Sequence, residues 1–221
     1  MSMKVILKSL LITVIALLVI LLSNIVAVEL IGIPALIGIL QFIICLAAIF
    51  ILSRRKLSQY GFRGARSVSY PVLLLWVFLI HLLLWLSLRI LGIDEGEHPL
   101  QEHGLFYIIT QALILAPLTE ELIFRGLVQS YLKPYKQKGF RVINIFLSYP
   151  VLFATLLFTL SHLPMVLRNM GLFGGMPVLL SALLYGLLLG YFREKHDSLI
   201  PPIIGHFAAN LLAFLSLLLF G

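Results

Sequence analysis

Apolar runs long enough to cross a lipid bilayer recur along the whole chain, and this recurrence limits the fold more than any other feature. About 20 apolar residues in a helix cross the hydrocarbon core. Because lipid offers the backbone no hydrogen-bond partner, such runs span it as helices. The runs lie at about 8–28, 31–52, 70–93, 105–130, 145–165, 176–192 and 199–220. The sequence therefore predicts an all-α, polytopic transmembrane bundle of about seven spans, with six to eight as the limits.

The composition is that of a membrane domain. Of 221 residues, 61% are apolar and 11% are charged, whereas soluble domains carry about 25% charged residues. No polar stretch could form a second domain, so residues 1–221 are predicted to be one integral membrane domain. The net charge of +7 lies mainly in short loops, as membrane topology requires, and we expect no nucleic-acid partner. Cys45, the single cysteine, lies in an apolar run and is expected to pack there.

The charged loops indicate the topology. Lys and Arg precede the first run and cluster after the second, fourth and sixth, whereas acidic residues follow the third. With seven spans, every basic cluster falls on one side of the membrane. The positive-inside rule then places the N-terminus in the cytoplasm and the C-terminus outside the plasma membrane. The first run is longer than the core of a signal peptide and is expected to be a retained helix.

Ionisable residues inside the fourth run are the first indication of function, because a charge at bilayer depth costs at least about 2.5–3.5 kcal/mol. Glu121 and Arg125 are four residues apart, so they share a helix face and are predicted to pair. Glu120 is turned about 100° from Glu121. We therefore expect Glu120 to point elsewhere and to be free as an acid, a base or a ligand.

Two further polar motifs lie at the end of the fifth run and within the seventh. They read Phe158-Thr-Leu-Ser-His162 and His206-Phe-Ala-Ala-Asn210. His206 and Asn210 are one turn apart and are predicted to face the same way. By contrast, His81 in the third run could be a packed hydrogen-bonding residue, and Arg89 is expected to extend to the interface.

Helix geometry tests whether these motifs can share one depth. At about 1.5 Å per residue, Glu120 lies roughly 18 Å from the basic loop at Lys133, and His206 roughly 12 Å from the same side. His162 would lie about 30 Å deep if its span began at Val142, but roughly 18–20 Å deep if it began at Tyr149 or Pro150. Proline favours a first helical turn, so we prefer the later start, with residues 137–147 at the interface.

The side chains of these motifs suit peptide hydrolysis. A carboxylate and an imidazole can deprotonate one water for attack on an amide, while an imidazole and a carboxamide can stabilise the oxyanion. The alternative is a zinc site with two nitrogens and one oxygen from His162, His206 and Glu120. The sequence lacks His-Glu-x-x-His, the strong signal for a zinc peptidase. Ser161 beside His162 is no evidence for a serine protease, because helix neighbours point about 100° apart.

These motifs resemble those of the CAAX prenyl endopeptidase and bacteriocin-processing (CPBP) family, in the same order, within about residues 105–215. That family shows Glu-Glu-x-x-x-Arg, then Phe-x-x-x-His, then His-x-x-x-Asn or Asp. The resemblance implies a helical intramembrane fold with a cavity open to the cytoplasmic side. It also implies that Glu120 and His162 activate water and that His206 and Asn210 hold the oxyanion, with Glu121, Arg125 and Phe158 as supporting residues.

The family has been described both as metal-dependent and as a glutamate peptidase that needs no metal. A carboxamide is a poor zinc ligand, so we expect no metal cofactor. If a metal such as zinc binds, Glu120, His162 and His206 are its expected ligands.

The resulting hypothesis is an intramembrane endopeptidase that cuts a peptide bond near the cytoplasmic side of the membrane. Its expected partners are membrane lipids and a peptide or protein substrate, with a lipid-modified protein or a leader peptide as candidates. The main alternative is a non-catalytic membrane scaffold or bacteriocin-immunity protein of the same fold. A transporter would use the buried charges as an ion relay, but it calls for repeats, and we find none in the sequence.

Overall fold

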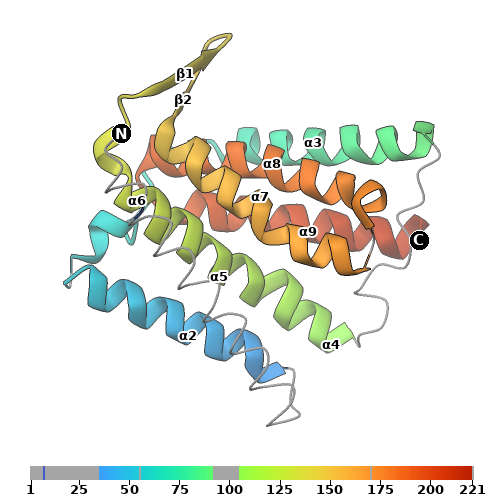
Figure 1. Cartoon of the computed structure of the whole chain (residues 1–221), viewed down its shortest axis with the longest axis horizontal. Helices are drawn as coiled ribbons and strands as arrows, with labels where there is room; N and C mark the ends of the chain where they lie inside the picture. The colour runs from blue at the N-terminus through green and yellow to red at the C-terminus, as the bar shows by residue number, and fades with distance from the viewer. Residues whose placement is uncertain (1–6, 8–34, 55, 92–104, 170, 221) are drawn as a thin grey trace.

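The protein is a bundle of long helices in a computed structural model, which describes residues 7, 35–54, 56–91, 105–169 and 171–220 (Figure 1). The prediction of an all-α membrane bundle is confirmed. The long elements are α2 (Ala35–Leu52), α3 (Tyr70–Leu91), a continuous helix from Leu105 to Tyr131, α7 (Tyr149–Asn169), α8 (Gly171–His196) and α9 (Ile200–Phe220). The short elements are the 3₁₀ turns η2 (Leu57–Tyr60) and η6 (Lys133–Tyr135) and the strands β1 (Gly139–Val142) and β2 (Ile145–Ser148).

Five of the described helices are long and apolar enough to cross a membrane, so the chain is a multi-pass membrane protein. They are Tyr70–Ile90, Leu105–Tyr131, Tyr149–Leu167, Gly174–His196 and Ile200–Leu219. A shorter apolar helix, Gly38–Leu52, corresponds to the second predicted run. The first predicted run, at 8–28, lies outside the described residues.

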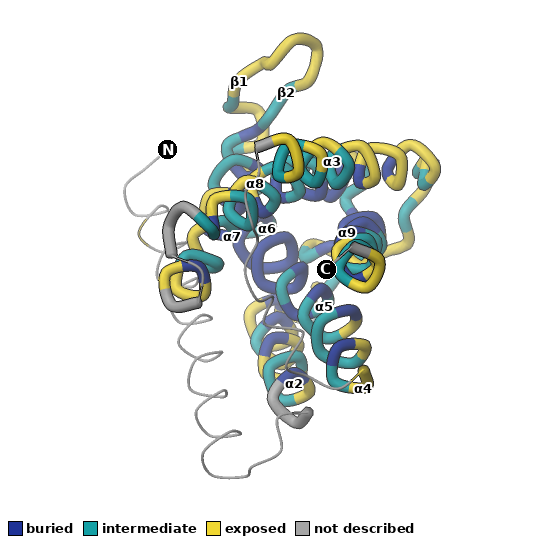
Figure 2. Tube along the Cα trace, turned by 90° about the vertical axis from the view of Figure 1, so that its right-hand side faces the viewer, coloured by how far each residue is buried: buried dark blue, intermediate teal, exposed yellow. Residues whose placement is uncertain are grey.

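The helix from Leu105 to Tyr131 lies at the centre of the bundle. Figure 2 shows its second half as a buried core with α2, α7 and α9 around it. Ile123, Phe124 and Val128 are almost fully buried there, and Ile49 of α2 packs against the same cluster. Large apolar side chains cover the outside of the bundle, as on α3, where Leu83 and Ile90 are exposed. Exposed apolar side chains suit a lipid-facing surface, so the buried polar residues of the central helix stand out.

α7 begins at Tyr149, with Pro150 as its second residue, which confirms the later of the two predicted starts. α7 packs most extensively against α8. Gly186 of α8 permits a close approach to Thr155 of α7, because a Cβ added at Gly186 would lie 2.7 Å from the Thr155 methyl carbon. The close packing of α7 on α8 fixes the position of the α7 polar residues, including His162.

The segment before α7 is an antiparallel β-hairpin, which the sequence did not reveal. In its register Phe140 pairs with Leu147 and Val142 pairs with Ile145. The hairpin extends beyond the edge of the helical bundle in both views (Figures 1 and 2). The segment expected at the interface thus contains a small β-ribbon, residues 139–148, at the end of a span.

Candidate active site

The central helix departs from α-helical geometry on both sides of the paired glutamates. It runs through α4 (Leu105–Tyr107), the π-helical η4 (Ile108–Leu115), α5 (Ala116–Glu121), the π-helical η5 (Leu122–Val128) and α6 (Gln129–Tyr131). Pro117 has no N–H to donate within the helix, and the N–H of Ala116 donates five residues back, to Gln111. Wider π-turns are frequent at functional sites. Glu120 and Glu121 lie in the six-residue α-helical segment between them.

Glu121 and Arg125 form a fully buried ion pair, as their spacing predicts. Nη1 of Arg125 lies 2.9 Å from Oε1 of Glu121, and both side chains are 0% exposed. The other guanidinium nitrogen, Nη2, donates to the carbonyl oxygen of Gly186 on α8. The guanidinium also lies over the Phe158 ring of α7, 4.6 Å from its centroid. The pair removes two net charges from the bundle interior and joins the central helix to α7 and α8.

His206 of α9 bridges the two glutamates through its two ring nitrogens. Nδ1 lies 2.8 Å from Oε1 of Glu121, while Nε2 lies 3.7 Å from Oε2 of Glu120. A carboxylate only accepts hydrogen bonds, so Nδ1 carries a proton. The turn of about 100° between the two glutamates did not indicate that they would share a neighbour on another helix. The two carboxylates do leave the helix in different directions, but an imidazole between them reaches both.

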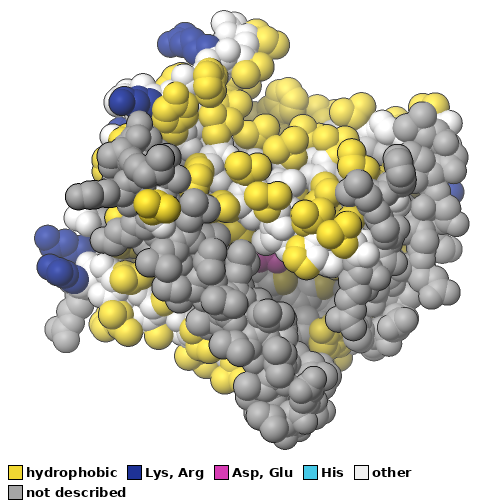
Figure 3. Space-filling model, viewed as in Figure 1, with side chains coloured by type: hydrophobic (Ala, Val, Ile, Leu, Met, Phe, Trp, Pro, Cys, Tyr) yellow, Lys and Arg dark blue, Asp and Glu magenta, His cyan; other side chains and the backbone are white. Residues whose placement is uncertain are grey.

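Glu120 differs from its neighbours in its access to solvent. Its side chain is 29% exposed, compared with 9% for His206 and 0% for Glu121. Figure 3 shows acidic surface near the middle of one face of the molecule, among hydrophobic side chains and away from the basic left edge. Of the two adjacent carboxylates, Glu120 is the one that a water molecule or a substrate can reach.

Phe158 brings the second imidazole to the same place. Its ring packs edge-on against both His162 (centroids 4.9 Å apart) and His206 (5.7 Å). Nδ1 of His162 lies 2.9 Å from the carbonyl oxygen of Phe158, one turn back on α7. A carbonyl can only accept, so Nδ1 carries a proton. In the neutral ring the lone pair is therefore on Nε2, beside the cluster.

Ser161 and Asn210 make bonds to helix backbone. The Ser161 hydroxyl donates to the Phe158 carbonyl oxygen at 2.7 Å and lies 3.5 Å from Nδ1 of His162, so it is occupied within its own helix. The Asn210 amide donates to the carbonyl oxygen of Ala112 at 2.8 Å. His206 and Asn210 therefore face the same central helix, as predicted, and Asn210 braces the π-helical segment η4.

Gln129 extends the polar row and was not singled out from the sequence. It is buried, and its amide nitrogen donates to the carbonyl oxygen of Gly190 at 2.9 Å. Glu121, Arg125 and Gln129 recur every four residues, so this periodicity was the available signal. Among the described residues, Oε2 of Glu121, Nε of Arg125 and Oε1 of Gln129 have no hydrogen-bond partner. The row thus holds hydrogen-bonding atoms inside the bundle that have no partner among the described residues.

A second ionic cluster lies at the end of the spans where the basic loops meet. Asp197, in the turn between α8 and α9, accepts from Lys133 (2.9 Å), Arg193 (3.0 Å) and Arg63 (3.0 Å). Burial raises the pKa of Asp197, but hydrogen bonds and charges from Lys133 and Arg193 outweigh it and leave the pKa below its usual value. Gly61 has φ +90° and lies against the Arg193 guanidinium. This cluster ties three loops together.

The predicted zinc ligands do not form a metal site as they stand. Within the described ranges, no three His, Cys, Asp or Glu side chains come together as a ligand group. Nδ1 of His206 is held by Glu121 and Nδ1 of His162 by the Phe158 carbonyl oxygen, which leaves Nε2 of both rings and the Glu120 carboxylate as the atoms that would bind a metal. Because no three such side chains among the described residues are grouped closely enough to hold a metal ion, we derive no step through one.

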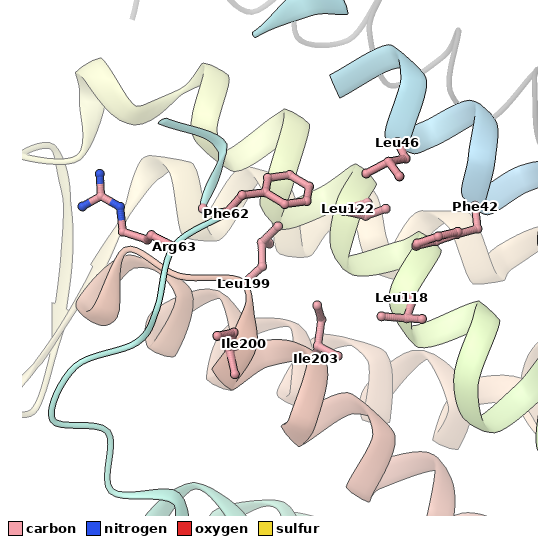
Figure 4. A pocket seen from close by; sticks show the side chains of 10 residues that line it. Phe42, Leu46, Phe62, Arg63, Leu118, Leu122, Leu199, Ile200 and Ile203 are labelled. Carbon is pink, nitrogen blue, oxygen red and sulfur yellow. The ribbon is translucent and has the colours of Figure 1, made fainter. Parts of the chain in front are cut away.

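An apolar pocket of about 440 Å³ lies beside the site, between the central helix, α2 and the start of α9 (Figure 4). Leu118 and Leu122 flank the two glutamates in sequence, and Ile203 precedes His206 by one turn of α9. Arg63 lies at the end of the pocket near the basic loops. The remaining lining residues are Phe42, Leu46, Gly61, Phe62, Leu199 and Ile200.

Ionisable side chains inside a helical membrane bundle mark a candidate functional site, and here they form a buried carboxylate–imidazole–guanidinium cluster beside the partly exposed Glu120. The family model described as Type II CAAX prenyl endopeptidase Rce1-like matches residues 102–212. The chain therefore belongs to this peptidase family, and its expected partner is a peptide or protein substrate. No curated protein and no solved structure matches the chain. The matched range contains all seven residues singled out in the three motifs.

Proposed function

We propose that this protein is an intramembrane endopeptidase that uses a glutamate-activated water. The observation that carries the proposal is the partly exposed carboxylate of Glu120 opposite the Nε2 edge of His206, with Glu121 on the other edge at 2.8 Å. Both imidazoles contact the same Phe158 ring. The basic end of the bundle is proposed to face the cytoplasm, as the positive-inside rule requires, in the plasma membrane.

In the proposed reaction, Glu120 takes a proton from a water whose oxygen attacks the carbonyl carbon of the peptide bond. Nε2 of His162 accepts a hydrogen bond from the second hydrogen, which stays on the water oxygen, and so orients the water. The carbonyl oxygen becomes an oxyanion. When the tetrahedral intermediate collapses, the carbon–nitrogen bond breaks and Glu120 returns its proton to the leaving amine.

His206 is proposed to stabilise the oxyanion in its doubly protonated form. The Glu121 carboxylate at Nδ1 fixes the orientation of the ring, as the aspartate does in a catalytic triad. Nε2 then carries a hydrogen that can be donated to the substrate oxygen. Asn210 has a second amide hydrogen beyond the one bound to Ala112, and we assign it to the same oxyanion. Arg125 holds Glu121 in place.

The apolar pocket is proposed to hold nonpolar parts of the substrate that lie away from the reacting bond. Leu118 and Leu122 belong to the helix that carries Glu120, but side chains two positions apart on a helix point about 200° apart, so a substrate would reach around the helix to occupy the pocket and meet the carboxylate. A lipid-modified protein or a hydrophobic leader peptide has groups of this kind.

The experiment compares membrane-protein fragments from cells that express either the wild-type protein or the Glu120→Gln variant at equal membrane levels. We expect new peptide termini in the wild-type sample that are missing with the variant. Purified protein in vesicles should then cut a synthetic peptide spanning such a terminus. Identical fragments from both samples, together with an unchanged cellular phenotype, would contradict the peptidase and favour the scaffold or immunity function.

A further inference from the structure

The β-hairpin of β1 and β2 has one apolar face that is exposed. Side chains alternate between the two faces of a strand, so the paired residues Phe140 with Leu147 and Val142 with Ile145 share a face. Phe140 is 60% exposed and Ile143, in the turn, is 91% exposed. Exposed apolar patches of this kind mark contact surfaces.

The base of the hairpin attaches it to the bundle. Ser148, which is buried, donates from its hydroxyl to the Glu194 carboxylate of α8 at 2.7 Å. The N–H of Tyr149 bonds to the carbonyl oxygen of Lys138, and the Phe140 ring packs edge-on against Tyr149. The base of the ribbon is therefore fixed and one edge of the Phe140 ring is in contact, while most of the apolar face and the tip remain uncovered by the described residues.

The turn residue adds an independent observation. Ile143 has φ +54°, a conformation that a β-branched residue rarely adopts. Two-residue hairpin turns favour Gly, Asn or Asp at positions with positive φ. Ile143 thus combines an unfavourable backbone conformation with the most exposed side chain of the hairpin. This combination indicates that Ile143 contacts an apolar surface outside the chain.

The position of the hairpin identifies the partner. It leaves the bundle sideways, across the direction of the spans, and at the end where the basic side chains lie (Figures 1 and 3). A ribbon in this direction runs along the membrane surface. Lys136, Lys138 and Arg141 adjoin its apolar face in sequence and are exposed, and basic residues beside apolar ones are what anionic lipid surfaces bind.

We propose that the hairpin is an interfacial anchor, in which Phe140, Val142 and Ile143 insert among the lipids while the three basic residues contact anionic headgroups. The anchor holds the start of α7, and with it the depth of His162, at a fixed level in the membrane. This function is separate from peptide cleavage and does not depend on it.

The test places an environment-sensitive fluorophore at the tip of the full-length protein. Ile143→Cys is labelled in a Cys45→Ala background, because Cys45 is the single native cysteine. The protein is reconstituted in phosphatidylcholine vesicles with and without phosphatidylglycerol. We expect blue-shifted emission, strong quenching by spin labels placed high on the acyl chains, and little quenching by iodide. Val142→Cys, labelled in the same way, guards against misfolding of the Ile143 variant.

The matched control is Gln59→Cys in the η2 turn, which is also exposed at the basic end. We expect its label to report water. Iodide quenching at 143 and 142 equal to that at 59 would overturn the insertion, as would protection that arises only when a cell extract is added. Emission and quenching that are identical with and without phosphatidylglycerol would overturn the contact with anionic headgroups. No arm measures cleavage, so failure here is distinct from failure of the proposed peptidase.

Discussion

The protein contains two ionic clusters that are built alike and placed differently. In the centre, Glu121 binds Arg125 and His206 within the bundle, and Arg125 has no exposed surface. At the basic end, Asp197 binds three cations, and its side chain and that of Arg63 are 28% and 45% exposed. Water can replace a lost partner in the second cluster but not in the first. The two clusters therefore differ in burial rather than in their number of ion pairs. We expect the buried Glu121 cluster to influence a reaction beside it, and the exposed Asp197 cluster to connect loops only.

The largest effect should follow from removing the charge of Glu120. Glu120→Gln keeps the shape of the side chain but removes the base, so we expect the cleavage rate to fall by about 10²–10⁴ with little change in stability. Asp197→Asn makes the same chemical change in the other cluster and should leave the cleavage rate near that of the wild-type protein. Cleavage assays on both purified variants check this. A Glu120→Gln enzyme as active as Asp197→Asn would remove the catalytic distinction between the clusters.

The second effect is on stability. Arg125→Met leaves the buried Glu121 carboxylate without its cation, and we expect a loss of about 3–5 kcal/mol of unfolding free energy. The matched variant, Arg63→Met, removes an exposed partner of Asp197 and should cost about 0.2–1 kcal/mol. Equilibrium unfolding in mixed detergent micelles measures both. The double variant with Glu121→Gln should recover part of the loss, and equal costs for Arg125→Met and Arg63→Met would contradict the comparison.

The third prediction separates bracing from chemistry on α9. Asn210→Leu removes the bond to Ala112 and the proposed oxyanion donor, so we expect kcat to fall by about 10²–10³ and stability by about 1 kcal/mol. Ser216→Ala removes a comparable α9 bond, the 2.7 Å contact with His81 on α3, and should affect stability alone. If both variants lose the same small amount of activity, Asn210 is only a brace.

The smallest effect is a pH dependence at the basic end. The pKa of Asp197 is lowered in the folded protein, so its stabilising contribution is complete above the ordinary aspartate pKa of about 4 and is lost as the pH falls through the lower, folded value. We expect the wild-type protein to lose stability over that acidic range and Asp197→Asn to lack this part of the loss. Melting temperatures of both proteins, measured down to pH values below about 4, provide the check. If the melting temperatures of the wild-type protein and Asp197→Asn fall in parallel with pH, the Asp197 cluster does not contribute pH-dependent stability.

Short-range geometry made much of the site predictable from the sequence. The spacing of Glu121 and Arg125 predicted their pairing, and Pro150 predicted where α7 begins; both are confirmed. Hydrophobicity and length predicted the helical bundle. The roles given to Glu120, His162, His206 and Asn210 remain predictions.

Features that depend on distant residues or on backbone register were not predictable. Asp197 meets Lys133 and Arg63 across long stretches of chain, and local patterns contain no signal for such contacts. The shared contact of Glu120 and Glu121 with His206 depends on where α9 lies. The π-helical segments arise from a shift of backbone hydrogen bonds, which leaves the apolar pattern of the central helix almost unchanged.

The two π-helical stretches also affect how this chain should be aligned with its relatives. A π-turn holds one residue more than an α-turn, so deleting one residue between Ala112 and Ala116 would return the stretch to α register. Each residue of register corresponds to about 100° of rotation. Ala112 would then turn away from Asn210 while Glu120 still faced His206. A one-residue alignment gap at this point would therefore mark a homologue that keeps every residue of the three motifs but lacks the hydrogen bond from Asn210 of α9 to Ala112.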